Sequence, residues 1–203
     1  LLEDRDRDGR YEHATVFADN LKWPTGVVCW KGGVFVTASP DILYLVDHDR
    51  DGVAEERRTV FTGFGAGLDP LNMQALVNNL QWGPDGRMWV AEMADYPMGI
   101  DHKDKPGSRI VALTDADGDG RYDKRTLFAD GLETANTVLP WRDGVLVTQP
   151  PDILFLRDDD GDGVADTREL LFSGFPVGNT QHNINGLTRG LDNWVYAANG
   201  GNH

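Results

Sequence analysis

The chain has 203 residues, a formal net charge of −14 and a sequence pI of about 4.6. The 33 acidic residues outnumber 19 basic ones, and no basic stripe is present, which disfavours a nucleic-acid partner. No apolar run is long enough to span a membrane, and the single cysteine, Cys29, excludes an internal disulfide. We expect Cys29 to be a buried, small apolar residue of an inner strand.

In chain order, short runs rich in Val, Ile, Leu and aromatic residues alternate with turn residues. The first complete unit has such runs at 27–30, 34–37, 42–46 and 59–61, and an acidic loop separates the third run from the fourth. The next unit opens with 80–82 and 88–90 around Gly83-Pro84-Asp85-Gly86. This pattern predicts four short strands per unit, joined by tight turns.

The acidic loops share a nine-residue pattern, Asp-x-Asp-x-Asp-Gly-x-x-Asp/Glu. Alternate carboxylates can converge on one calcium ion, and the glycine allows the sharp turn that this requires. The alternative is that Asp and Gly merely cap hairpins; four copies with acids at all four positions favour calcium. The predicted ligands are Asp4, Asp6, Asp8 and Glu12; Asp47, Asp49, Asp51 and Glu55; Asp115, Asp117, Asp119 and Asp123; and Asp158, Asp160, Asp162 and Asp166.

The spacing of the acidic loops reveals an internal repeat. The loops start at 4, 47, 115 and 158, and segments such as Pro40-Asp41-Ile42-Leu43 return 111 residues later as Pro151-Asp152-Ile153-Leu154. Units of roughly fifty residues with four strands each predict an all-β fold, a β-propeller of about four blades. We treat residues 1–203 as one propeller domain or segment with repeats 1–111 and 112–203.

The chain begins in the tail of a third strand and finishes just past a second strand. Either the N-terminal strand closes the ring with the C-terminal ones, or the chain is part of a larger, six-bladed ring. We favour the second interpretation, because Leu1-Leu2 is too short to replace a full third strand.

The loops predict a structural role for calcium, stiffening the blade rims. Arg7 and Arg50 occupy the fourth position of the first two loops, where the others have glycine, so we expect the loops at Asp115 and Asp158 to bind most tightly. Four bound divalent cations would raise the formal charge from −14 to −6. Millimolar calcium affinity would suit an extracytoplasmic, periplasmic or secreted location.

One histidine departs from the repeat. His182 precedes a predicted innermost strand, where its counterpart in the other half is Ala75. Imidazole titrates near neutral pH, so His182 is a candidate general base; the alternative is an ordinary loop histidine. The insertion at 94–107 could reach a partner or substrate.

The run from His182 to Tyr196, with Leu187, Gly190 and Asp192, resembles the motif of the soluble quinoprotein sugar dehydrogenases, although Leu191 replaces a usual proline. The resemblance implies a six-bladed propeller in which His182 takes a proton from a sugar hydroxyl while pyrroloquinoline quinone (PQQ) accepts hydride. It also implies cofactor contacts from Asn183, Asn185 and Arg189.

As a whole, the chain resembles the propeller of the bacterial membrane-bound dehydrogenase family, through its acidic loops and the run Leu191-Asp192-Asn193-Trp194-Val195-Tyr196. That family carries a c-type haem, but no Cys-x-x-Cys-His occurs here, so a haem domain or other electron acceptor would lie outside this sequence.

Three functional classes stay open. The first is a segment of a PQQ-dependent sugar or alcohol dehydrogenase. The second is a calcium-dependent lactonase or esterase, because Asn79 and Asn185 precede innermost strands where such propellers hold a central ion. The third is a non-catalytic binding scaffold with calcium only at its rim.

Overall fold

The structure is a computed structural model that describes residues 1–64, 78–93, 95 and 107–200. In these residues, the fold consists of short strands and one 3₁₀ turn, η1 (Thr180–His182). The strands are β1 (Leu2–Glu3), β2 (His13–Ala14), β3 (Pro24–Trp30), β4 (Gly33–Ala38), β5 (Asp41–Val46), β6 (Glu56–Thr62), β7 (Asn78–Trp82), β8 (Met88–Glu92), β9 (Ser108–Thr114), β10 (Lys124–Leu132), β11 (Thr137–Trp141), β12 (Gly144–Gln149), β13 (Asp152–Arg157), β14 (Thr167–Phe172), β15 (Asn185–Arg189) and β16 (Val195–Ala198).

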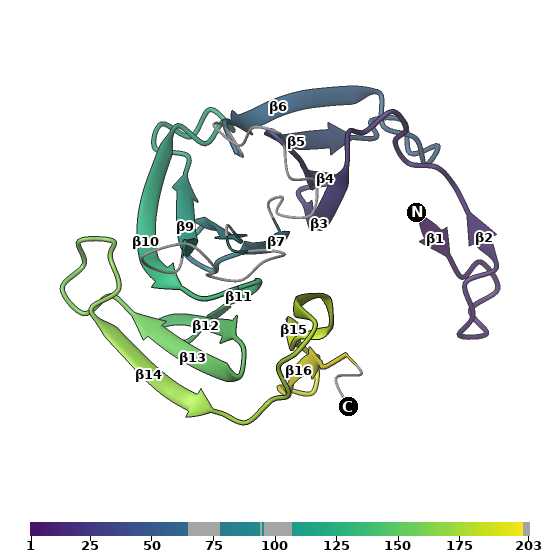
Figure 1. Ribbon diagram of the computed structural model, residues 1–203. Coiled ribbons are helices and arrows are strands. Elements are labelled where there is room, and N and C mark those ends of the chain that lie inside the picture. Colours follow the sequence, from purple (N-terminus) through teal and green to yellow (C-terminus); the bar gives the residue numbers. More distant parts are fainter. Residues whose placement is uncertain (65–77, 94, 96–106, 201–203) are drawn as a thin grey trace.

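The strands form antiparallel sheets in chain order. Blade 1 is β3-β4-β5-β6, blade 2 is β7-β8-β9-β10 and blade 3 is β11-β12-β13-β14. The chain ends form two-stranded sheets, β1-β2 and β15-β16. Figure 1 shows these sheets arranged as an open arc, with β7, β11 and β15 toward the centre and β6, β10 and β14 outside. The predicted blades are thus seen as three whole blades and two half-blades.

In blades 1 and 3, a glycine at the start of the second strand allows the third strand to approach closely. Gly144 follows the turn between β11 and β12, and a Cβ atom there would collide with the carbonyl oxygen of Leu156 on β13. Gly33 has the same relation to Leu45 in blade 1. The turns between second and third strands in these two blades contain the cis bonds Ser39-Pro40 and Pro150-Pro151.

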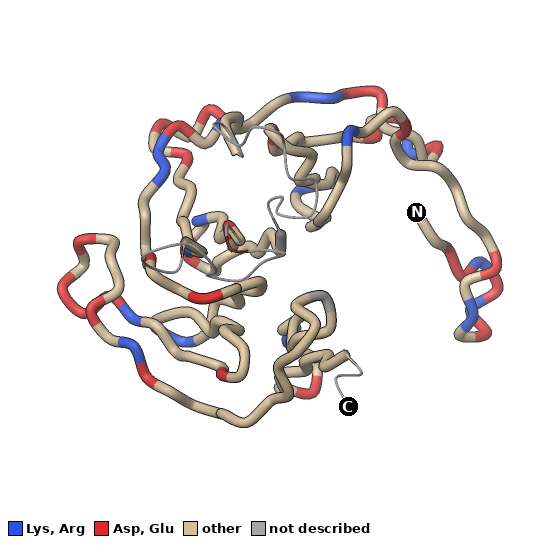
Figure 2. Tube along the Cα trace, viewed as in Figure 1, with Lys and Arg blue, Asp and Glu red and all other residues tan. Residues whose placement is uncertain are grey.

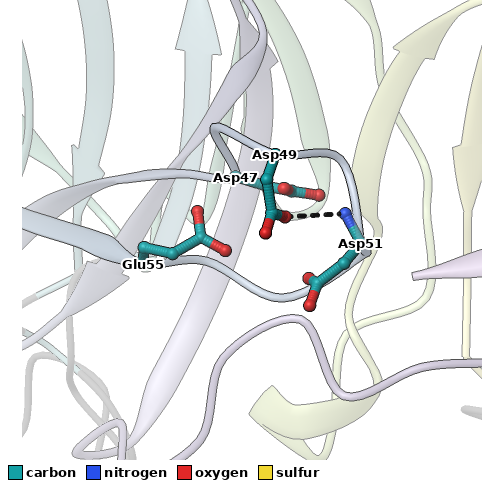
Figure 3. A group of neighbouring side chains, drawn as sticks. All are labelled: Asp47, Asp49, Asp51 and Glu55. Atoms are coloured by element: carbon teal, nitrogen blue, oxygen red, sulfur yellow. Dashed lines mark hydrogen bonds between the residues drawn. The ribbon is translucent and has the colours of Figure 1, made fainter.

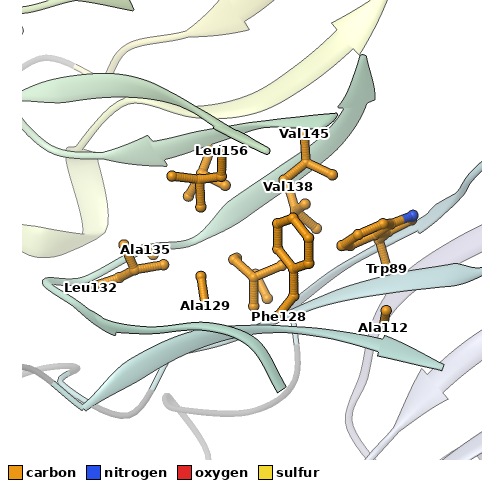
Figure 4. Close-up of a cluster of buried hydrophobic side chains, with 12 residues drawn as sticks. Trp89, Ala112, Phe128, Ala129, Leu132, Ala135, Val138, Val145 and Leu156 are labelled. Atoms are coloured by element: carbon orange, nitrogen blue, oxygen red, sulfur yellow. The ribbon is translucent and has the colours of Figure 1, made fainter. Parts of the chain in front are cut away.

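The hydrophobic core lies between blades. At the interface of blades 2 and 3, the rings of Trp89 and Phe128 meet edge to face with centroids 4.8 Å apart, and Val138 and Val145 of blade 3 close the cluster (Figure 4). Equivalent clusters join blade 1 to blade 2 and blade 3 to β15. Each blade therefore buries its apolar faces against its neighbours, as in propeller folds.

Arginines of the fourth strands also contact the preceding outer strand or the segment that follows it. The guanidinium of Arg57 on β6 donates to the backbone oxygen and the carboxylate of Asp19, at 2.7 and 2.9 Å. Arg168 on β14 donates to the backbone oxygen of Asp130 at 2.9 Å. Both residues of the second contact follow those of the first by 111 residues.

Antiparallel order gives the arc two faces. One, the acidic-loop face, carries the acidic loops between third and fourth strands and the turns between first and second strands. The other, the linker face, carries the connections between blades and the turns between second and third strands. Cys29 on β3 is exposed, so the prediction that it is buried was wrong. No helix in the described ranges is long and apolar enough to cross a membrane.

Candidate functional site: the acidic loops and the linker face

In the three blades, the acidic loop joins the third and fourth strands, as predicted, and the first acidic loop joins the two strands of the β1-β2 sheet. The loops lie between β1 and β2, β5 and β6, β9 and β10, and β13 and β14. Figure 2 shows acidic residues, in red, gathered at these hairpin ends. We number the nine residues of each loop 1 to 9.

All four loops share one hydrogen-bond pattern. The position 1 carboxylate accepts the N–H of the position 6 glycine at 2.9 Å in every loop. Position 3 accepts from the N–H of position 5, and position 5 from that of position 7. The position 9 carboxylate closes the loop by accepting the N–H of position 2. The backbone thereby fixes the carboxylates before any ligand is present.

These bonds bring carboxylate oxygens together. In the second loop, oxygens of Asp47, Asp49, Asp51 and Glu55 all lie within 4.8 Å of one another (Figure 3). The other loops bring three together by the same measure: Asp4, Asp6 and Asp8; Asp115, Asp117 and Asp119; and Asp158, Asp160 and Asp166. Glu12, Asp123 and Asp162 are outside those groups, although each accepts a loop N–H. Such oxygen clusters could bind a metal ion such as calcium.

Position 4 has a conformational requirement that the sequence pattern did not reveal. Arg7 and Arg50 adopt φ values of 64° and 65°, and Gly118 and Gly161 adopt 77° and 84°. Glycine reaches this left-handed region freely, whereas an L side chain is strained there. This strain is a second reason, beside the arginine charge, to expect the tightest calcium binding in the last two loops. The second loop nevertheless brings the most carboxylates together.

Replacing Arg50 by glycine should stabilise the protein by about 0.5–1 kcal/mol, because the left-handed backbone is then unstrained. Calcium affinity should also rise, since a cation beside the carboxylates is removed. Arg50→Gln separates the two effects: it should raise affinity without raising the melting temperature in chelator. Thermal melts and calorimetric titration measure both. Equal melting temperatures for the glycine and glutamine variants in chelator would contradict the conformational argument.

Three of the loops also brace their blade against the preceding part of the chain. The N–H of position 8 donates to a carbonyl of the preceding outer strand or its extension: Ala54 to Phe17 at 2.8 Å, Tyr122 to Val60 at 3.1 Å, and Ala165 to Phe128 at 2.7 Å. The position 6 glycines of these three loops approach the same segments, and a Cβ at Gly163 would lie 3.1 Å from Cγ2 of Thr126. The predicted rim loops are therefore joints between neighbouring sheets.

Two ionisable groups reflect this packing. Burial, followed by the negative charge of Asp115, raises the pKa of the Tyr122 phenol. The backbone N–H of Arg5 holds the pKa of Glu12 below its usual value. The third loop has a competing cation, because the Arg58 guanidinium lies 3.0 Å from where a Cβ of Gly120 would be.

The linker face carries the predicted catalytic histidine. His182 ends η1, is exposed, and donates its backbone N–H to the carbonyl of Asn179 at 2.8 Å. Asn183 is 4% exposed, and its carbonyl accepts the side-chain amide of Asn185 at 2.9 Å. These three predicted residues lie within one short segment.

Arg189 does not join them. It ends β15 on the acidic-loop face, about four residues or 13 Å of strand away from Asn185. Its guanidinium bonds Asn193 at 2.8 Å and covers the Trp141 ring at 5.6 Å. The predicted cofactor residues therefore do not converge on one surface.

Asparagines on the linker face connect neighbouring blades, which the sequence analysis did not predict. The Asn79 Oδ1 atom accepts the N–H of Val138 at 3.2 Å, and the Asn136 amide donates to the Ile184 carbonyl at 3.2 Å. The N–H of Gly186 donates to Thr137 Oγ1 at 2.9 Å. Asn79, proposed as a ligand for a central ion, thus holds blade 2 to blade 3.

Asp95, also missed from sequence, closes the base of the predicted insertion, of which residues 94 and 96–106 lie outside the described ranges. Its carboxylate is 1% exposed and accepts the N–H groups of Gly107 at 2.8 Å and Ser108 at 2.9 Å, plus the Ser108 hydroxyl at 2.8 Å. Blades 1 and 3 have a tight turn between their second and third strands, whereas in blade 2 the Asp95 carboxylate joins the two ends of the insertion. We call this contact the Asp95 clip.

Asp95→Asn should destabilise the protein by about 2–3 kcal/mol, because an amide NH₂ would face buried N–H groups and the charge-assisted bonds would be lost. Asp85→Asn is the matched control: it changes the same groups in an exposed turn, where Asn is tolerated. Denaturant unfolding of both variants measures the difference. If both variants lost a similar amount of stability, the Asp95 clip would not stabilise the protein as argued.

The sheets, the arc and the shared loop geometry define a propeller-like protein with acidic clusters suited to a metal. A search of solved structures found luciferin-regenerating enzyme, with a TM-score of 0.53 and 14% identity over 75% of this chain and 48% of that one. The chain thus spans about half of that protein, and the likeness concerns the fold alone. The chain belongs to the family described as "Domain of unknown function (DUF7133)", whose model matches residues 1–86 and 79–203. No curated protein matched.

Proposed function

We propose that this chain is a calcium-binding β-propeller segment, in which calcium in the acidic loops braces successive blades. The observation that carries the proposal is the repeated loop geometry: each loop presents gathered carboxylates, and position 8 of three loops bonds the preceding sheet. Bound calcium would offset the repulsion among carboxylates held within 4.8 Å of one another.

Isothermal titration tests this directly. We expect calcium to bind at up to four sites of the chain, with weaker binding by magnesium, which demands a stricter octahedral geometry. Asp49→Asn should weaken one site, because it removes a charged ligand while an amide oxygen can still accept the Asp51 N–H. Absence of bound calcium at millimolar concentration would contradict the proposal.

A second candidate, the PQQ-dependent sugar or alcohol dehydrogenase, rests on the His182–Tyr196 run and on the exposure of His182 at the linker face. In that function, His182 would accept the hydroxyl proton of the substrate. Asn183, Asn185 and Arg189 do not together fit a bound PQQ, since Arg189 is at the opposite end of β15 and already paired. Any PQQ contacts from this group would come from Asn183 and Asn185 alone.

This candidate predicts that PQQ binds the chain, measured by equilibrium dialysis, and supports dye reduction by sugars or alcohols. His182→Ala should abolish turnover but retain PQQ, and Arg189→Ala should change neither. Failure to bind PQQ would remove the candidate. Lactone hydrolysis that needs calcium and ignores PQQ would favour the lactonase alternative, and neither activity would favour the scaffold.

We also propose an extracytoplasmic location, because millimolar calcium is available there to occupy weak loops. Fractionation of cells that make the protein, with antibody detection, tests this. Recovery in the cytoplasmic fraction would contradict it.

A further inference from the structure

A cavity of about 280 Å³ lies between blades 2 and 3 on the acidic-loop face. One wall is the β7–β8 hairpin, with Arg87 and Trp89, and the other is the β11–β12 hairpin, with Pro140 and Arg142. Asp158, position 1 of the fourth acidic loop, also lines the cavity. The cavity therefore lies at an interface between two whole blades and adjoins a predicted calcium site.

A proline explains the space. Equivalent places on the first strands, facing the preceding blade, are taken by Trp82 in blade 2, Pro140 in blade 3 and Arg189 on β15. Trp82 packs on Trp30 of blade 1 with ring centroids 4.1 Å apart, and Arg189 covers the Trp141 ring of blade 3 at 5.6 Å. Pro140 is too short to reach across in the same way, so a cavity is left between blades 2 and 3.

Arg87 is held in place at the wall formed by blade 2. Its Nε atom donates to Asp85 Oδ2 at 2.5 Å, and its guanidinium lies over the Trp89 ring, 4.8 Å from the centroid. Among the described residues, none accepts a hydrogen bond from its two terminal nitrogen atoms. The ion pair and the ring orient the guanidinium, and its terminal N–H groups stay available to a ligand.

Arg142 supplies a second guanidinium from blade 3. It adopts a φ of 52° in the hairpin turn, and its guanidinium lies 6.0 Å from the Trp141 centroid. In the described part of the chain, no carboxylate or carbonyl group pairs with this guanidinium. Lys31, its repeat counterpart in blade 1, has a φ of 42° in the equivalent turn.

The carboxylates around the cavity already have partners. Asp85 pairs with Arg87, and Asp143 lies 3.6 Å from Nη1 of Arg157. Asp158 accepts two backbone N–H groups of its own loop, at 2.7 and 2.9 Å. The charged groups that line the cavity and still lack a partner among the described residues are therefore N–H donors of two arginines. Such donors match the oxygen atoms of an anion.

We propose that this cavity binds a small oxyanion, such as a carboxylate, phosphate or sulfate group, between Arg87 of blade 2 and Arg142 of blade 3. The apolar surfaces of Pro140 and Trp89 accommodate the carbon atoms of an organic ligand that carries this group. Because each blade contributes one arginine, the bound anion also links the two blades.

Calcium in the fourth loop strengthens this binding, a step that rests on the proposed function. Asp158 lines the cavity and also belongs to the carboxylate group of that loop, with oxygens within 4.8 Å of those of Asp160 and Asp166. Without a cation, these negative charges repel an anion in the cavity, and a bound calcium ion offsets the repulsion. The coupling is reciprocal, so the anion raises the calcium affinity of the fourth loop by the same factor.

NMR titration of the chain with sodium sulfate and with sodium acetate, in calcium and at constant ionic strength, tests the site. We expect the amide signals of residues 142–144 to shift and saturate, and the tighter of the two probes identifies the preferred group. Arg142→Asn should weaken binding about tenfold or more, because it removes a charged donor. Its fold should be retained, since asparagine tolerates the left-handed backbone.

Lys31→Asn is the matched control. It removes the same charge from the equivalent turn of blade 1 and should leave the dissociation constant of the anion unchanged. Arg87→Gln, which tests the other wall, should weaken binding as Arg142→Asn does. The absence of saturable shifts at residues 142–144, or equal affinities for Arg142→Asn and the natural chain, would overturn the cavity site, whether or not the loops bind calcium.

The same titration in chelator tests the coupling. We expect the anion to bind about fivefold or more weakly there than in calcium. Equal anion affinities in calcium and in chelator, with calcium bound to the fourth loop, would overturn the coupling. If the loops bind no calcium while anion binding still depends on Arg142, the proposed function fails and the cavity site is supported.

Discussion

Removal of calcium should lower the melting temperature of this protein by about 10 °C or more. A ligand at about 100 times its dissociation constant contributes about 2.7 kcal/mol per site. For a domain of this size, each kcal/mol corresponds to roughly 2–4 °C. Because three loops bond the preceding sheet through position 8, loss of calcium should loosen joints between blades as well as the loops. Scanning calorimetry in calcium and in chelator measures the change.

The control for this prediction is ionic strength. Sodium chloride at matched ionic strength should not replace calcium, because screening alone cannot coordinate the carboxylates. Asp49→Asn should melt like the natural chain in chelator and below it in calcium, since its turn is retained. Identical melting with and without calcium would show that the loops act as hydrogen-bonded turns alone.

Phe128→Ala should destabilise the protein by about 3–5 kcal/mol, the usual cost of deleting a buried aromatic side chain. The ring is 1% exposed and meets Trp89 edge to face at the interface of blades 2 and 3. The bond from Ala165 to the Phe128 carbonyl uses the backbone, so it survives the substitution. Denaturant unfolding measures the loss.

Leu127→Ala is the matched control, on the same strand with its side chain 38% exposed. It should cost less than about 1 kcal/mol, because little buried surface is lost. If the two variants lost equal stability, the interface between blades 2 and 3 would not carry the core as described.

The strands were predictable because local chemistry determines them. In runs such as Ile42-Leu43-Tyr44-Leu45, successive side chains point to opposite faces of a strand. The acidic pattern marks the hairpin between the third and fourth strands, so the order of strands and loops within a blade could be predicted from the sequence. The arc itself agrees with a propeller, and the ring size stays a prediction. The sequence predicted that Cys29 lies in a strand, which is correct, and that it is buried, which is wrong. Its burial depends on which part of the structure covers β3, and the local sequence does not reveal this.

Contacts between blades were not predictable from pattern alone. Position 8 of the loops holds Ala54, Tyr122 and Ala165, residues with no shared chemistry, because the bond to the preceding blade uses the backbone N–H. Asp95 resembled any acidic loop residue, and its role depends on Gly107 and Ser108 folding back to it. The resemblance grouped Arg189 with His182, yet the length of β15 separates them, because Arg189 lies on the acidic-loop face and His182 on the linker face.

The direction of the braces has a consequence for synthesis. Three of the acidic loops bond the preceding outer strand or its extension, so each acceptor carbonyl, such as Phe17 for Ala54, leaves the ribosome before its donor. A folded blade therefore already presents its acceptor carbonyl when the next acidic hairpin is synthesised. The propeller can fold blade by blade from the N-terminus, without breaking contacts formed earlier.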